Sequence, residues 1–196
     1  YSTAAQGNRF SAENIQRVEV IRGPGSAKYG GFAELAVIRV TTLAGDSNWT
    51  GFDASARYSV FDDLVYGRRD IGVTWAENLG ISRLAADFTG GQGHRSNEVY
   101  TDFWGNSYDM AEASDVSPLH GGLHFQSRGL DVLAGFDRYT QTHRDNYTRI
   151  LRRVRHSDYN TYFFRALYAA ELSDSVKLIP SLHFRRAYPW KSVSNV

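Results

Sequence analysis

Several features that mark other protein classes are missing from this chain. None of its 196 residues is cysteine, which excludes disulfide scaffolds, cysteine-ligated zinc and thiol catalysis. Proline is scarce, with 4 residues, and the formal net charge is only +1. A protein whose main activity is to bind nucleic-acid phosphates needs a clear basic excess, so we expect no nucleic-acid partner.

Long hydrophobic runs are missing as well. The longest apolar run covers five residues, 166–170, whereas a transmembrane helix needs about 20. A membrane-spanning β-strand needs only alternation, so the bilayer is not excluded. No charged segment followed by an apolar one opens the chain, and we interpret it as a mature or truncated piece without a signal peptide. A hydrophobic content of 42% is too high for a disordered chain.

Beyond about residue 48, apolar and polar side chains alternate in short segments separated by glycine and polar clusters. A period of two predicts β-strands with one apolar and one polar face. Pro180 has no backbone donor and weakens the last of these segments as a strand. The seven predicted strands cover residues 49–61, 70–77, 83–88, 119–126, 131–137, 159–170 and 176–185.

The predicted connections alternate in length. Strands two and three, four and five, and six and seven are joined by about three to five residues each, whereas residues 89–118 and 138–158 form long polar and aromatic links. Tight turns at one end and long loops at the other are the organisation of an outer-membrane β-barrel. A soluble β-sandwich does not need this asymmetry, although it does not forbid it, so we favour the membrane barrel.

Residues 13–30 carry a different pattern, ENIQRVEVIRGPGSAKYG. It resembles the late plug-domain signature of TonB-dependent outer-membrane receptors. The residues that carry the resemblance are Arg17, Glu19, Arg22, Gly23, Pro24, Ser26, Tyr29 and Gly30. The match weakens over residues 32–42, where Ala36 replaces the usual glycine and Arg39 the usual asparagine.

The same residues also favour two short strands and a turn on their own chemistry. Alternation around Val18 and Val20 predicts a short strand, residues 23–26 a turn, and residues 37–41 a second strand. Residues 43–48 then form a polar connector into the first long strand. A phosphate-binding nest at residues 23–28 is disfavoured, because the spacing of a P-loop is missing.

The resemblance implies an all-β transmembrane antiparallel β-barrel preceded by the C-terminal part of an α/β plug domain. Residues 1–45 would be the plug part and residues 46–196 the first seven of about 22 barrel strands, so we expect the sequence to be a fragment. It further implies a Gram-negative outer-membrane location with lipid and lipopolysaccharide around the barrel. The TonB–ExbB–ExbD complex would energise uptake of a scarce small-molecule nutrient, foremost a ferric siderophore or similar metal chelate. The alternative is a small structural or adhesive outer-membrane barrel without transport.

No residues predict catalysis, a cofactor or a metal site. His120 and His124 would lie about 13 Å apart on a strand, too far for one zinc ion, and we interpret them as isolated lumen-facing side chains. No Ser/His/Asp arrangement or carboxylate pair stands out, so we do not expect an enzyme.

The long loops are the candidate ligand-binding segments. Trp104 and Tyr108 lie in the first loop. Arg149, Arg152, Arg153 and Arg155 lie in or near the second and would attract an anionic ligand or lipopolysaccharide phosphate. The plain alternative for these arginines is a solvated, salt-bridged loop.

Overall fold

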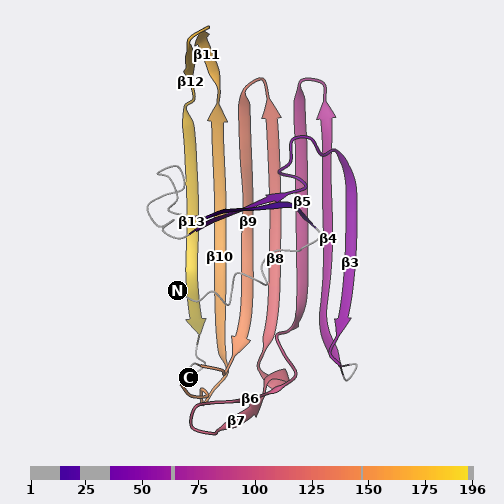
Figure 1. The fold of residues 1–196 in the computed structure, drawn as a ribbon, viewed down its shortest axis with the longest axis vertical. Coiled ribbons are helices and arrows are strands. Elements are labelled where there is room, and N and C mark those ends of the chain that lie inside the picture. The colour runs from indigo at the N-terminus through magenta and orange to yellow at the C-terminus, as the bar shows by residue number, and fades with distance from the viewer. Residues whose placement is uncertain (1–13, 23–35, 63–64, 147, 194–196) are drawn as a thin grey trace.

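The protein, seen here as a computed structural model, is an all-β chain (Figure 1). The structure describes residues 14–22, 36–62, 65–146 and 148–193. All strand pairs within these ranges are antiparallel, and their one helical element is a short 3₁₀ helix, η4 (Met110–Glu112). Among the described residues, no helix has the length and hydrophobicity needed to cross a membrane.

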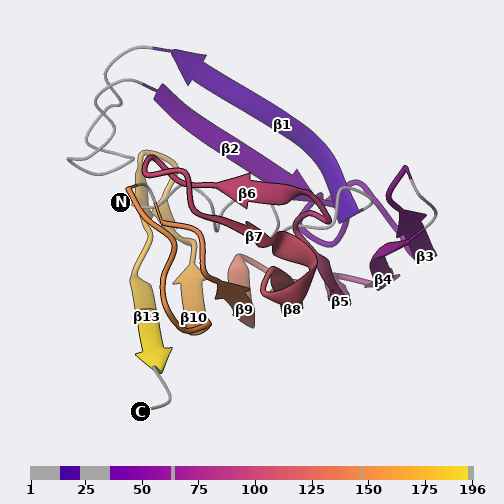
Figure 2. The same ribbon diagram turned by 90° about the horizontal axis from the view of Figure 1, so that it is seen from below.

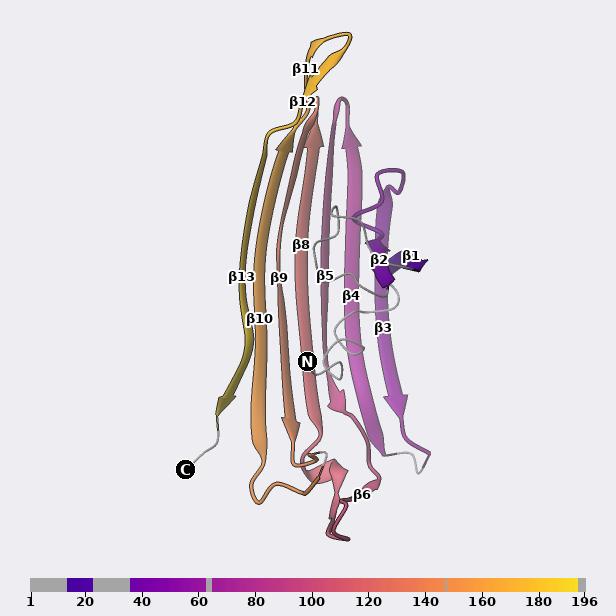
Figure 3. The ribbon, with the colours of Figure 1, turned by 60° about the vertical axis from the view of Figure 1, so that its left-hand side comes forward.

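Seven long strands form one sheet in the order β13-β10-β9-β8-β5-β4-β3 (Figures 1 and 3). Each long strand pairs with the next long strand along the chain, which gives a meander. Six of the seven predicted strands are present, and most of these extend further than the alternation indicated. The seventh, predicted as one strand over residues 176–185, is interrupted at residues 179–180, so that its long strand begins at Ser181. The bounds of the seven long strands are β3 (Gly51–Val60), β4 (Tyr66–Leu79), β5 (Ser82–His94), β8 (Asp115–Ser127), β9 (Leu130–His143), β10 (Arg155–Tyr168) and β13 (Ser181–Val193).

Two of the three predicted tight turns are confirmed. Gly80 lies between β4 and β5 with φ of 64°, and Arg128 and Gly129 lie between β8 and β9 with φ of 40° and 84°. Positive φ at the central residues matches the twist of the flanking strands. The third is wrong, because β11 (Ala170–Ser173) and β12 (Val176–Leu178) form a separate hairpin between β10 and β13. Pro180 has no N–H and accepts from the amide of Tyr168, so the main ladder ends there.

The opposite end of the sheet carries the longer connections. Residues 95–114 contain the hairpin of β6 (Val99–Thr101) and β7 (Ser107–Asp109) followed by η4, and residues 144–154 join β9 to β10. The predicted asymmetry is confirmed only in part, because residues 169–180 at the tight-turn end form a connection as long as residues 144–154. Both loops are shorter than predicted, because residues such as Gly93 belong to strands. Gly93 lies so close to the backbone of β4 that a Cβ would sit 2.5 Å from the Gly67 carbonyl oxygen.

The two faces of the seven-stranded sheet differ in chemistry, as the alternation predicts. One row across all seven strands consists of Phe52, Trp75, Ala86, Leu123, Ala134, Phe164 and Phe184, and we call this side the apolar face. Phe52 and Phe184 remain 67% and 56% exposed. The neighbouring positions, such as Thr74 and Asp87, lie on the polar face. An exposed apolar surface of this extent marks contact with a membrane or with another protein.

The two predicted N-terminal strands are confirmed as β1 (Ile15–Arg22) and β2 (Ala36–Thr42), which pair with each other as an antiparallel hairpin. It forms its own two-stranded sheet, which lies across the polar face (Figures 1 and 2). Both sides of this hairpin expose apolar side chains: the register partners Val20 and Ile38, at 58% and 68%, lie on one side, and Ile21, at 40%, lies on the other. The predicted turn at residues 23–26 lies outside the described residues.

Candidate functional site

The connector between β2 and β3 is fastened to the polar face by Arg83. This side chain is 5% exposed, and its guanidinium donates to the backbone carbonyls of Ala44, Asp46 and Trp49 over 2.8–3.2 Å. Arg83 belongs to the polar positions of β5, so the strand aims it at the connector. The planar guanidinium thereby holds three backbone carbonyls of a segment that has no regular strand or helix of its own.

Small side chains let the connector approach the sheet closely. Ala76 of β4 and Ala85 of β5 lie opposite each other and are 2% and 0% exposed. They form a buried cluster with Ala44, and Trp49 packs against it. Larger side chains at these paired positions would lift the connector away from Arg83.

The start of the hairpin is fastened to the same face by Asn14. Its side-chain amide donates to Asp87 over 3.2 Å and accepts from the Thr74 hydroxyl over 3.1 Å, and its carbonyl accepts from the Leu43 amide. Asp87 and Thr74 are register partners on β5 and β4. Both chain ends of the hairpin, the start of β1 and the end of β2, therefore meet the polar face.

A histidine between two carboxylates continues this contact across the sheet. His120 of β8 places Nε2 2.8 Å from Asp87 and Nδ1 2.7 Å from Asp137 of β9. Because Asn14 bonds both Asp87 of β5 and Thr74 of β4, the start of the hairpin and four strands share one network. The prediction that His120 and His124 are isolated is wrong: period-two alternation gives the face of a side chain but not its cross-strand partner.

His124 has a carboxylate partner of its own. Its Nε2 lies 3.0 Å from Asp131, which also accepts from Gln126 and from Arg165. These groups lie on β8, β9 and β10, toward the tight-turn end. Over the described residues no group of three or more His, Asp or Glu side chains has an arrangement suited to a metal ion.

Only some of the residues that carry the resemblance to the plug-domain signature lie in the described part of the chain. Glu19 of β1 lies opposite Arg39 of β2, 3.5 Å away, and 3.6 Å from Arg17. Arg39, which stands where the resembled family usually has asparagine, thus pairs with a signature carboxylate. Arg22 ends β1 and is exposed. Gly23, Pro24, Ser26, Tyr29 and Gly30 lie outside the described residues.

The two long loops are joined into one unit at their end of the sheet. Asp145 of the second loop accepts from both Arg95 and the Tyr108 hydroxyl of the first, over 3.0 Å in the second case. The Arg144 guanidinium lies 5.1 Å from the centre of the Tyr108 ring. We call Arg95, Tyr108 and Asp145 the loop clamp.

Asp102 makes a second connection between the loops. It accepts from the amide of Ile150 in the second loop, over 2.9 Å, and from the amides of Trp104 and Asn106 within its own turn. These contacts fix the tip of the β6–β7 hairpin beside the arginine-rich segment. The sequence placed Tyr108 in a candidate ligand-binding loop but did not predict the contacts of Asp102 or of the loop clamp, because contacts between loops leave no periodic signal.

The predicted ligand-binding residues divide into exposed and buried groups. Trp104 is 71% exposed and makes an edge contact with Phe103, with ring centroids 5.3 Å apart. Tyr108 is 7% exposed, and its hydroxyl is engaged in the loop clamp. The four predicted arginines are exposed, and Arg149, Arg152 and Arg155 form no ion pair with any carboxylate that the structure describes.

The clamp predicts a pH dependence of loop order. Burial alone would raise the pKa of Asp145, but the hydrogen bond and charge of Arg95 lower it overall. The pKa of Asp102 is lowered too, since amide hydrogen bonds, first that of Ile150, outweigh burial. Carboxylates with lowered pKa values stabilise the folded loops above their unfolded pKa of about 4 and lose this effect as pH falls through the folded value.

We therefore expect a spin label at Phe103→Cys to be restrained at neutral pH and to gain mobility only below about pH 4. The label is unique, because the chain has no cysteine. In an Asp145→Asn background the label should be more mobile at neutral pH, and its mobility should rise less as the pH falls below about 4. The rise that remains would come from protonation of Asp102. A step centred near pH 6 would contradict the assignment to carboxylates.

Comparisons with protein-family models, with curated proteins and with solved structures found no match to this chain. Function therefore has to be inferred from the arrangement of the residues described above.

Proposed function

We propose that the chain is part of a TonB-dependent outer-membrane receptor for energised uptake of a scarce nutrient, foremost a ferric siderophore or similar metal chelate. In this proposal the seven-stranded sheet is a section of a transmembrane β-barrel wall in a Gram-negative outer membrane. The apolar face meets lipid, the polar face lines the lumen, and the β1–β2 hairpin is the end of the plug. The chain performs no bond chemistry and needs no cofactor.

One observation carries this proposal: the N-terminal hairpin is fastened to the polar face while the apolar face stays uncovered. Asn14 and Arg83 make the fastening contacts, and Phe52 and Leu123 are examples of the uncovered side. A water-soluble sheet with a hairpin against it would bury its apolar side against the hairpin. The reverse arrangement suits a wall with lipid outside and a polar element inside.

The sheet edges are consistent with a longer wall. Within the described ranges β3 and β13 each pair with one neighbour only, so each leaves a row of backbone groups unpaired. In lipid such groups cost several kcal/mol each, and closure of the ring removes that cost. In this proposal, further strands would complete the ring.

The loops and the polar-face contacts take separate roles in this proposal. Exposed Trp104 and the basic segment around Arg152 capture the ligand, and the loop clamp holds both in place. The TonB–ExbB–ExbD complex then pulls on the plug. The Asn14 and Arg83 contacts determine how firmly the plug end stays on the wall during that pull.

The test is uptake in the native bacterium with the gene deleted. Growth on a panel of ferric chelates, cobalamin and glycans should fail for one ligand, return with the intact gene, and fail again when TonB is removed. Outer-membrane insertion is checked in parallel. Uptake that does not depend on TonB, or a deletion with no uptake defect, would favour a structural or adhesive barrel instead.

The arginines of the second loop give a specific prediction. Replacing Arg149, Arg152, Arg153 and Arg155 by Gln in the intact receptor should weaken uptake of an anionic ligand by about tenfold or more, since several charge-assisted contacts are lost. The defect should grow as salt is lowered. Gln at the exposed Arg128, in a turn at the other end, is the matched control. Unchanged uptake would exclude this loop from capture.

A further inference from the structure

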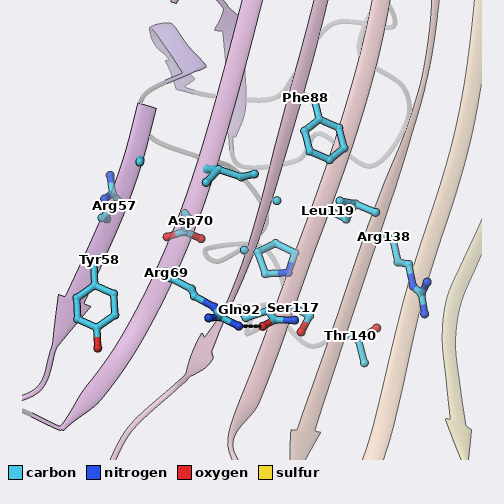
Figure 4. Close-up of a pocket in the computed structure, with 15 residues that line it drawn as sticks. Arg57, Tyr58, Arg69, Asp70, Phe88, Gln92, Ser117, Leu119, Arg138 and Thr140 are labelled. Carbon is cyan, nitrogen blue, oxygen red and sulfur yellow. Dashed lines mark hydrogen bonds between the residues drawn. The ribbon is translucent and has the colours of Figure 1, made fainter. Parts of the chain in front are cut away.

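The apolar face has a hollow near its loop end, with a volume of about 780 Å³ (Figure 4). Its floor includes Gly90 of β5, where a side chain is missing; a Cβ there would lie 3.2 Å from Leu119 Cδ1. Ile71, Phe88 and Leu119 border it on neighbouring strands. This part of the hollow fits an elongated hydrocarbon group.

A polar row closes the hollow on the side nearer the loops. Arg69 of β4 lies opposite Gln92 of β5 and donates to its side-chain oxygen over 2.7 Å. Ser117 of β8 lies opposite Thr140 of β9 in the same row (Figure 4). These side chains occupy positions on the apolar face, so their polarity is a departure from the pattern of that face.

Two arginines in the hollow have no anionic partner among the residues that the structure describes. Arg69 and Arg138 are exposed, and neither forms an ion pair with a carboxylate in the described parts of the chain. Arg138 lies opposite Leu119, so its charge stands directly beside apolar side chains. On the lipid side of a barrel an arginine costs about 2–4 kcal/mol at mid-bilayer and about 0–1 near the interface. Head groups supply the missing counter-charge there.

We propose that this hollow binds a phosphorylated acyl glycolipid of the outer leaflet. Its phosphates contact Arg69 and Arg138, and one acyl chain lies over Gly90 between Ile71 and Leu119. Guanidinium groups recognise phosphate through paired hydrogen bonds, and the amide and hydroxyls of the polar row donate to sugar oxygens. The inference rests on the proposed function, because the apolar face must meet lipid.

The spacing of the two arginines favours a large head group. They lie on β4 and β9, three strand spacings apart, which corresponds to about 14 Å. Phosphates carried at the two ends of one disaccharide span such a distance, whereas the single phosphate of an ordinary phospholipid contacts one arginine at a time. We therefore expect a doubly phosphorylated lipid to bind more tightly than a singly phosphorylated one.

The experiment measures lipid A binding to the complete protein in detergent by native mass spectrometry. Arg69→Gln combined with Arg138→Gln should weaken binding of doubly phosphorylated lipid A at least tenfold, and removal of one lipid phosphate should weaken wild-type binding. Arg128→Gln, an exposed arginine in the turn at the other end of the sheet, should leave it unchanged. Equal binding by the double variant and wild type would overturn the site, and so would displacement of the lipid by millimolar inorganic phosphate alone.

A second variant tests the acyl part and protects against a folding defect. Gly90→Val keeps both arginines but fills the floor of the hollow, and should also weaken lipid A binding. Insertion is followed in parallel, with the same variants reconstituted in lipid, by a spin label at Val73→Cys on the apolar face. A label that contacts water rather than lipid would contradict the proposed function itself; a label in lipid with unaltered lipid A binding in both variants would remove only this site.

Discussion

Replacing Arg83 by Leu is expected to release the connector between the hairpin and the wall. Three backbone carbonyls, those of Ala44, Asp46 and Trp49, would lose their donor at once. At about 1 kcal/mol or more for each lost contact, the anchoring falls by about 3 kcal/mol, which increases the released population by about two orders of magnitude. Amide hydrogen exchange over residues 43–49 measures this directly.

The same variant tests the link between anchoring and function. If the hairpin is the end of a plug, as proposed, its release should raise ion conductance through the complete protein in a planar bilayer. Arg83→Lys keeps the charge but cannot reach several carbonyls with one planar group, and should give an intermediate result. Arg128→Leu, at an exposed turn, is the matched control. If exchange over residues 43–49 stays slow in Arg83→Leu, the fastening contact described here is wrong.

Replacing Asp145 by Ala is expected to separate the two long loops. Arg95 would be left half-buried without its carboxylate, and the Tyr108 hydroxyl would lose its acceptor. Removal of one partner from such a pair costs about 2–4 kcal/mol locally. Exposed arginines in the second loop are trypsin sites, so cleavage there should accelerate by more than about tenfold.

Two further substitutions are controls for the trypsin cleavage rate of the second loop. Asp145→Asn keeps the shape but not the charge and should accelerate cleavage less. Glu112→Gln removes an exposed carboxylate of the first loop and should have no effect. Cleavage of the Asp145→Ala variant at the wild-type rate would show that the loops are held by other contacts. Under the proposed function, ligand uptake should also fall with the loss of the clamp, although none of its three residues needs to touch the ligand.

The sequence predicted the sheet because its signal is local. Alternation over β3 and β8 assigns each side chain to a face without knowledge of any partner, and glycine at Gly80 and Gly129 marks the tight turns. The same reasoning underestimated strand length where glycines interrupt the alternation, as at Gly90–Gly93 in β5. It also missed the β11–β12 hairpin. The pairing of β10 with β13 ends at Pro180, and this can be recognised only when the register of the two strands is known.

The contacts that define the site were not predictable in this way. Asn14 and Asp87 are 73 residues apart, and Arg95 and Asp145 are 50 apart. Such pairs depend on strand order and register, which one sequence does not reveal. The sequence did place His120 and Arg83 on the polar side of their strands. It did not show which groups face these two side chains. For His120 the structure changes the interpretation from an isolated side chain to one that bridges two carboxylates.

The most direct test of the whole account is a spin-label scan along β4 in the complete protein inserted in lipid. Single cysteines at positions 71–76 are compared for collision with oxygen, which partitions into lipid, and with a nickel chelate, which stays in water. Oxygen contact should peak at positions 71, 73 and 75 and nickel contact at 72, 74 and 76, subject to shielding of Thr74 by Asn14 and of Ala76 by Ala44 of the connector. Water contact at Ile71 and Val73, or a scan without this alternation, would contradict a wall with lipid on its apolar face.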